Sequence, residues 1–137
     1  MKMKLTKIQK TNEKETFVDV KSSVTGDLYL PTQLMIDFLD NKIELEDMTF
    51  DDLYYLAEDN VYAKIGHPIL VKDKGIYNWI KTSNIKSFFK KDSDNDKLIL
   101  PKDFPLEVIN LLKEIKITSN MIVYLTQNSI YLGEILE

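Results

Sequence analysis

The chain has 137 residues, 44% of them hydrophobic and 29% charged, with a net charge of −4. This composition is typical of a globular protein and excludes a disordered chain, and the length suits one ordinary domain. No apolar run approaches the roughly 18–20 residues of a membrane-spanning helix, and no apolar stretch follows the lysine-containing start as in a secretory signal. The sequence therefore predicts a single domain, residues 1–137, with no membrane association and a cytoplasmic location.

The first part of the chain predicts three strands. Apolar residues recur at period two in 3–10 and 16–20, which is the pattern of a strand with one buried face. Gly26 and Asp27 predict a turn before a third strand at 28–30.

Three segments have the apolar stripe and the starting residues of helices. Thr49 and Asp52 also have the spacing of a capping box. The predicted helices are Thr32 to about Asn41, Thr49 to Asn60, and Phe104 to about Ile115 after Asp103.

The second half of the chain predicts further strands, with a turn at Gly66-His67-Pro68 and a final hairpin around Thr126-Gln127-Asn128. Residues 83–91 are ambiguous, although Ile85, Phe88 and Phe89 fit a short helix. The strands are expected at 61–65, 69–71, 76–80, 98–100, 121–125 and 129–136. We therefore predict an α+β fold with about three helices packed on about six to eight mostly antiparallel strands.

Two parts of the chain look alike, because 27–31 and 97–101 are each a strand that ends in proline and precedes a helix. Each unit leads later to a hairpin with an Ile-Tyr pair, at 76–77 and 130–131. A degenerate internal duplication would give a pseudo-twofold domain with both helices on one sheet. The alternative is that strand, proline and helix are a common way for an α+β domain to turn a corner.

Residue counts exclude several kinds of active site. Without cysteine there is no thiolate nucleophile or cysteine-based zinc site, and a single histidine cannot form a histidine pair or relay. That residue, His67, is interpreted as a turn residue. The four glycines form no phosphate-binding loop. We expect no catalytic residue, metal or cofactor, with a lysine-based or carboxylate-based enzyme as a remaining alternative.

Residues 92–96 place carboxylates at positions 1, 3 and 5 of a twelve-residue stretch that resembles an EF-hand or dockerin calcium loop. Ile99 and Asp103 fall at its positions 8 and 12. Position 6, a glycine in such loops, is Lys97, and position 10 is Pro101. These departures favour a solvated acidic turn over a cation site.

Negative charge is concentrated between residues 37 and 59, where nine carboxylates face one lysine, a local net of −8. Some of them suit the first turn of a helix, and a solvated helix face is the simpler interpretation. The functional interpretation is an acidic face that docks a protein with a basic surface, with Tyr54 or Tyr55 as the anchor. The predicted contact residues are Asp37, Asp40, Glu44, Glu46, Asp47, Asp51, Asp52, Tyr55, Glu58 and Asp59.

The next segment, 60–102, has nine lysines against four carboxylates, a local net of +5. Its aromatic residues alternate with lysines, as in surfaces that stack bases and contact phosphates. The candidate nucleic-acid residues are Trp79, Lys81, Lys86, Phe88, Lys90 and Lys91. All 18 basic residues are lysine, which counts against base-specific DNA recognition because the bidentate guanidinium is absent.

The leading prediction is a non-catalytic protein-interaction module, such as a regulator, inhibitor or accessory factor. The richness in lysine, isoleucine and asparagine points to a low-GC bacterium, a phage or another mobile element. The opposite charges of the two segments also raise self-association as an alternative. A nucleic-acid-associated protein is the second interpretation, and an unrecognised enzyme the third.

Overall fold

The computed structural model describes residues 1–11, 17–44, 46–73, 78–93, 104 and 106–136. Residues 10, 11, 17–21, 107 and 108 are described by their backbone alone. The described chain forms eight strands and three helices, which confirms the α+β class. They are β1 (Lys2–Thr11), β2 (Phe17–Pro31), α1 (Gln33–Leu39), α2 (Phe50–Leu53), β3 (Tyr54–Leu56), β4 (Leu70–Lys72), β5 (Trp79–Lys81), β6 (Ile85–Lys90), α3 (Leu106–Glu114), β7 (Met121–Thr126) and β8 (Ser129–Leu136).

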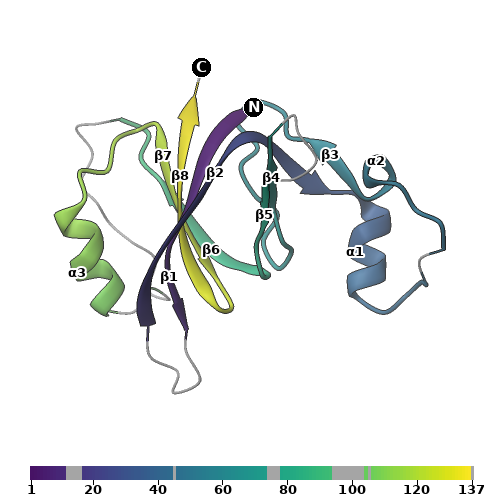
Figure 1. Ribbon diagram of the computed structural model, residues 1–137, viewed down its shortest axis with the longest axis horizontal. Helices are drawn as coiled ribbons and strands as arrows, with labels where there is room; N and C mark the ends of the chain where they lie inside the picture. The colour runs from purple at the N-terminus through teal and green to yellow at the C-terminus, as the bar shows by residue number, and fades with distance from the viewer. Residues whose placement is uncertain (12–16, 45, 74–77, 94–103, 105, 137) are drawn as a thin grey trace.

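All the strands belong to one antiparallel sheet, with the order β5-β4-β2-β1-β8-β7-β6 (Figure 1). The short strand β3 pairs with β2 beside β4. The first and last strands, β1 and β8, are neighbours, with Lys2 opposite Leu136. The predicted hairpin at 121–136 is confirmed as β7 and β8, whose side chains pair across the strands from Met121–Glu134 to Leu125–Ile130.

The sheet curls because both of its edge strands, β5 and β6, come from one bent run of chain, residues 79–90. The run begins as β5, paired with β4, and continues as β6, paired with β7. At the bend, the Gly66 N–H donates to the Ile85 carbonyl over 2.7 Å, and the Ile85 N–H donates to the His67 carbonyl over 3.2 Å. The apolar side chains on the inner side of this curl form the main core. They include Met3, Leu5, Leu28, Leu30, Ile69, Val71, Ile85, Ile122 and Tyr124.

On the outer side of the sheet, the alternate side chains of these strands pack into two smaller apolar clusters. Val123, Leu125 and Ile130 pack with Leu112 of α3, which lies at one end of the molecule (Figure 1). At the other end, α1, α2 and β3 pack Met35 and Tyr54 against Leu70 of β4, with Tyr29, Leu39, Phe50 and Leu53 around them. Burial on both faces explains why β7 is apolar from Met121 to Leu125.

Two predicted elements of the N-terminal half are wrong in part. There is no turn at Gly26 and Asp27, because β2 runs through them and pairs with β1 and β4. A side chain at Gly26 would collide with the Lys72 carbonyl, so the glycine allows β4 to approach closely. The helix predicted from Thr49 to Asn60 ends at Leu53, since Tyr54–Leu56 pairs with β2 instead.

Two predictions for the middle of the chain are also wrong. Residues 83–91 contain strand β6 rather than a short helix, because this segment pairs with β7. Residues 61–65 form no strand. The Tyr124 hydroxyl donates to the Tyr62 carbonyl over 3.0 Å, which ties the segment to the core by a side chain. The turn at Gly66 is confirmed, and Gly66 has a φ of 85°.

The internal duplication is not shown. The second proline-ended strand, 97–101, and the Ile-Tyr pair at 76–77 lie outside the described residues. The two helices that would correspond, α1 and α3, pack in different clusters at opposite ends of the sheet (Figure 1). In the described part of the chain, no helix has the length and apolar character needed to cross a bilayer.

Candidate functional site

The acidic segment, residues 37–59, includes the C-terminal end of α1 and all of α2, and Thr32 holds these two helices together. Thr32 is the N-cap of α1, where its Oγ1 accepts a hydrogen bond from the Met35 N–H over 3.3 Å. Its backbone N–H donates to the Leu53 carbonyl over 2.8 Å. Its hydroxyl lies 2.8 Å from the Asp52 carbonyl and 2.9 Å from that of Leu53, so it donates to the end of α2.

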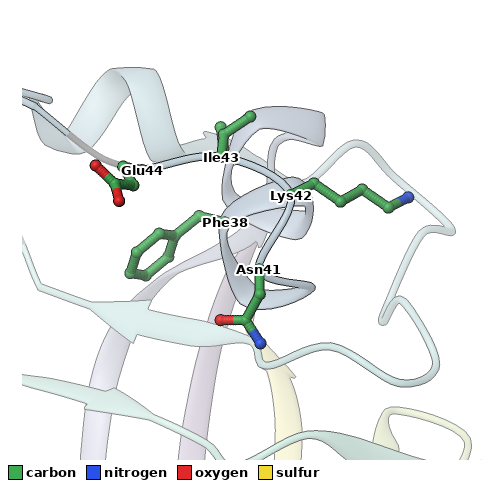
Figure 2. Close-up of a pocket in the computed structure, with 5 residues that line it drawn as sticks. All are labelled: Phe38, Asn41, Lys42, Ile43 and Glu44. Atoms are coloured by element: carbon green, nitrogen blue, oxygen red, sulfur yellow. The ribbon is translucent and has the colours of Figure 1, made fainter.

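Helix α1 ends in a left-handed turn that exposes the first part of the acidic segment. Asn41 has a φ of 59°, and the Lys42 N–H donates to the Asp37 carbonyl over 2.8 Å, as in a Schellman motif. Figure 2 shows the shallow hollow at this turn, lined by Phe38, Asn41, Lys42, Ile43 and Glu44. The Lys42 side chain extends away from Phe38 and Glu44 in this view (Figure 2).

The start of α2 confirms the predicted capping box. The Asp52 carboxylate accepts hydrogen bonds from the Thr49 N–H over 2.9 Å and from the Thr49 hydroxyl over 2.8 Å. These bonds favour the charged form, so they lower the pKa of the Asp52 carboxyl below its ordinary value. Asp52 therefore has a structural role within α2.

The nine carboxylates of the segment are almost all open to solvent. Asp37 is half-buried and accepts a hydrogen bond from the Gln33 amide over 2.9 Å. Apart from Asp52, the others form no hydrogen bond or ion pair with another side chain in the described part of the chain. The exposed ones are Asp40, Glu44, Glu46, Asp47, Asp51, Asp52, Glu58 and Asp59. We call these nine carboxylates, together with Tyr55, the acidic face, although Asp59 lies apart from α1 and α2 in a hollow that it lines with Met1, Lys90 and Asn120.

Apolar side chains are exposed within the acidic face. Phe38, Met48 and Leu56 are 37%, 38% and 50% exposed. Of the two tyrosines considered as anchors, Tyr55 is exposed on β3, and the Lys64 ammonium lies 5.1 Å from its ring centre. Tyr54 points to the opposite side of the strand and is buried.

Other candidate centres have less support. Within the described residues, no three His, Cys, Asp or Glu side chains gather closely enough to hold a metal ion. Asp92 and Ser93 are the only members of the calcium-like loop that lie within the described residues. His67 lies in the turn after Gly66, where its carbonyl accepts from Ile85, as a turn residue would.

The residues of the lysine-aromatic segment, Trp79 to Lys91, differ in exposure and contacts. Trp79 and Lys81 are exposed on β5, and Lys86 is exposed on β6. Phe88 packs against the main core instead. The ammonium groups of the last two lysines donate to backbone carbonyls, from Lys90 to Lys91 over 3.2 Å and from Lys91 to Ile117 over 3.1 Å.

Trp79 and Lys81 instead line an apolar groove of about 320 Å³ between α2 and the β4–β5 hairpin. The sequence predicted neither the groove nor the participation of Lys72 and Phe50. Only the strand register shows that Lys72 lies opposite Trp79 and that Leu70 lies opposite Lys81. The complete lining is Met35, Phe50, Leu53, Tyr54, Leu70, Lys72, Trp79 and Lys81.

No protein-family model, curated protein or solved structure matches this chain significantly.

Proposed function

We propose that this chain is a non-catalytic protein-interaction module, a regulator, inhibitor or accessory factor, that docks a partner with a basic surface on its acidic face. The observation that carries the proposal is that the carboxylates are almost all exposed and, within the described residues, not paired with lysines. Eight of the nine are exposed, and none forms an ion pair with a lysine in the described part of the chain. Their field is therefore available to a partner.

The acidic face combines long-range attraction with contact area. Exposed charges of one sign accelerate the encounter with an oppositely charged partner, but each exposed pair adds little affinity. Affinity comes mainly from a few large side chains buried at the centre of an interface. Phe38, Tyr55 and Leu56 are exposed among the carboxylates and are proposed as these anchors.

The carboxylates support a binding role better than an acid-base role. A carboxylic acid that transfers protons near neutral pH needs a raised pKa, which burial or a nearby like charge produces. At Asp52 the pKa of the carboxyl is lowered instead, because the carboxylate accepts hydrogen bonds from Thr49. A cytoplasmic location and an origin in a low-GC bacterium or mobile element remain part of this proposal.

A pair of charge reversals tests the proposal. Asp51→Lys with Glu58→Lys removes two exposed carboxylates of the acidic face and leaves the Thr49–Asp52 capping box intact. Asp92→Lys with Glu114→Lys is the matched control, because it changes the net charge equally at exposed positions elsewhere. Tagged forms of the wild-type chain and of both variants would be used to capture proteins from the native host, and circular dichroism would confirm folding.

We expect the wild-type chain and the control to retain one specific protein partner and the acidic-face variant to lose it. Raising the salt concentration should weaken capture, because exposed charges are screened within about 8–10 Å at physiological ionic strength. Equal capture by both variants would contradict the proposal. Recovery of a second copy of this chain as the partner would replace it with self-association.

A further inference from the structure

The apolar groove is built on the outer face of the β4–β5 hairpin, and it differs in charge from the acidic face. Cross-strand neighbours in an antiparallel pair point to the same side. Lys72 and Trp79 are therefore adjacent on this face, and so are Leu70 and Lys81. The groove floor thus carries two lysines beside a tryptophan that is 52% exposed.

Aromatic rings from α2 and its neighbours form the opposite wall. The Phe50 ring stacks on Tyr54 with centres 5.5 Å apart, and Tyr29 meets Phe50 edge-on at 4.9 Å. Tyr54 also belongs, with Met35 and Leu70, to the small core at this end of the molecule, so the wall is continuous with that core. A groove of about 320 Å³ with such walls lies within the size range of small-ligand pockets.

The two lysines of the groove have no anionic partner. The Lys72 ammonium lies 4.2 Å from the centre of the Phe50 ring and 5.9 Å from that of Tyr29. Neither Lys72 nor Lys81 has an ion pair with any carboxylate in the described part of the chain. A half-buried ammonium that contacts only ring faces is incompletely neutralised, so an anion placed beside it would be favoured.

A third polar group at the groove also lacks a partner. Tyr54 is 5% exposed, and its buried hydroxyl has no hydrogen bond within the described residues. Leaving such a buried group unpaired costs free energy. Burial, Asp27 and Asp51 together raise the pKa of the Tyr29 phenol, and Asp27 also lies opposite Lys72 in the strand register. An anion in the groove is therefore expected on the Lys81 side, away from Asp27 and Asp51.

We propose that this groove binds an aromatic carboxylate. The ring would lie against Trp79 and the Phe50–Tyr54 wall, and the carboxylate would contact the ammonium groups of Lys81 and Lys72. The same chemistry is presented by a free aromatic acid and by the C-terminal residue of a polypeptide that ends in phenylalanine. The site does not depend on the function proposed for the acidic face.

Trp79 is the only tryptophan of the chain, so its fluorescence reports directly on the groove. The probe is N-acetylphenylalanine, and its neutral amide is the matched control ligand. We expect a saturable change in Trp79 fluorescence with the acid and about tenfold weaker binding of the amide, because a charge-assisted hydrogen bond is lost. A short peptide ending in free phenylalanine, compared with its amidated form, separates the two sources of the ligand.

Lys81→Gln removes an exposed ammonium that forms no hydrogen bond or ion pair in the described part of the chain. It should therefore fold normally and weaken binding of the acid by about three- to tenfold. Lys86→Gln, an exposed lysine of β6, is the matched control and should change nothing. Binding of acid and amide with equal affinity, or an unchanged affinity in Lys81→Gln, would overturn the proposal. A fluorescence change caused only by a single-stranded oligonucleotide would assign the groove to nucleic acid instead.

Discussion

The backbone N–H of Thr32 and the carbonyl of Leu53 are joined by a hydrogen bond of 2.8 Å, so the start of α1 is fixed to the end of α2. The Thr32 hydroxyl adds the N-cap of α1 and a second bond to the same end of α2. One residue, Thr32, thus links the two helices through both its backbone and its side chain.

Replacing this hydroxyl should loosen the acidic face. Thr32→Val keeps the shape and the backbone N–H but removes the cap, and we expect a loss of about 1–2 kcal/mol in the free energy of unfolding. Urea denaturation measures this loss, and hydrogen exchange should show it as faster exchange in α1 and α2. Thr32→Ser restores the hydroxyl and should recover most of the stability. Equal losses in both variants would contradict a capping role.

The glycines at 26 and 66 should respond differently to the same substitutions. At Gly66 a side chain meets open space, but the φ of 85° disfavours alanine by about 1–2 kcal/mol, whereas asparagine tolerates this region. At Gly26 any side chain collides with the Lys72 backbone. We therefore expect Gly66→Asn to be milder than Gly66→Ala, and Gly26→Asn to be no milder than Gly26→Ala. Thermal unfolding of the four variants checks this pattern.

Tyr54 should contribute to unfolding in alkali. Burial raises the pKa of its phenol from 10.0 to about 12. The folded state thus holds the proton more tightly than the unfolded state, so this contribution to stability is complete below pH 10 and is lost as the pH rises towards 12. Tyr54→Phe should move the alkaline unfolding midpoint, followed by circular dichroism, to higher pH. Tyr55→Phe, the exposed neighbour on β3, should leave it unchanged.

Local signals predicted the parts of the fold that local chemistry determines. Thr32 and the Thr49–Asp52 pair were identifiable because a cap depends on residues three apart, and the β7–β8 hairpin because its strands are adjacent in sequence. β3 and β6 were missed, since residues 54–56 and 85–90 become strands only by pairing with β2 and β7, which are distant in the chain.

The candidate sites likewise include features that residue type predicts and features that depend on distant parts of the chain. Exposure of the acidic residues followed from their charge, because uncompensated carboxylates are rarely buried. In the lysine-aromatic segment, the packing of Phe88 against the core and the hydrogen bond from Lys91 to the Ile117 carbonyl could not be predicted from residue type. The groove depends on Lys72 lying opposite Trp79, a relationship set by the hairpin register and not by spacing along the sequence.

The pairing of β1 with β8 has a consequence for how the protein folds. Residues 2 and 136 are partners in the sheet, so closure of the main core requires a contact between very distant parts of the chain. Folds dominated by such contacts have a high contact order and fold slowly, in milliseconds to seconds for small domains. During synthesis, β1 must wait for residues 129–136 before its second neighbour exists. A chain that stops before β8 would expose Met3 and Leu5 at an unpaired strand edge, and it should therefore aggregate.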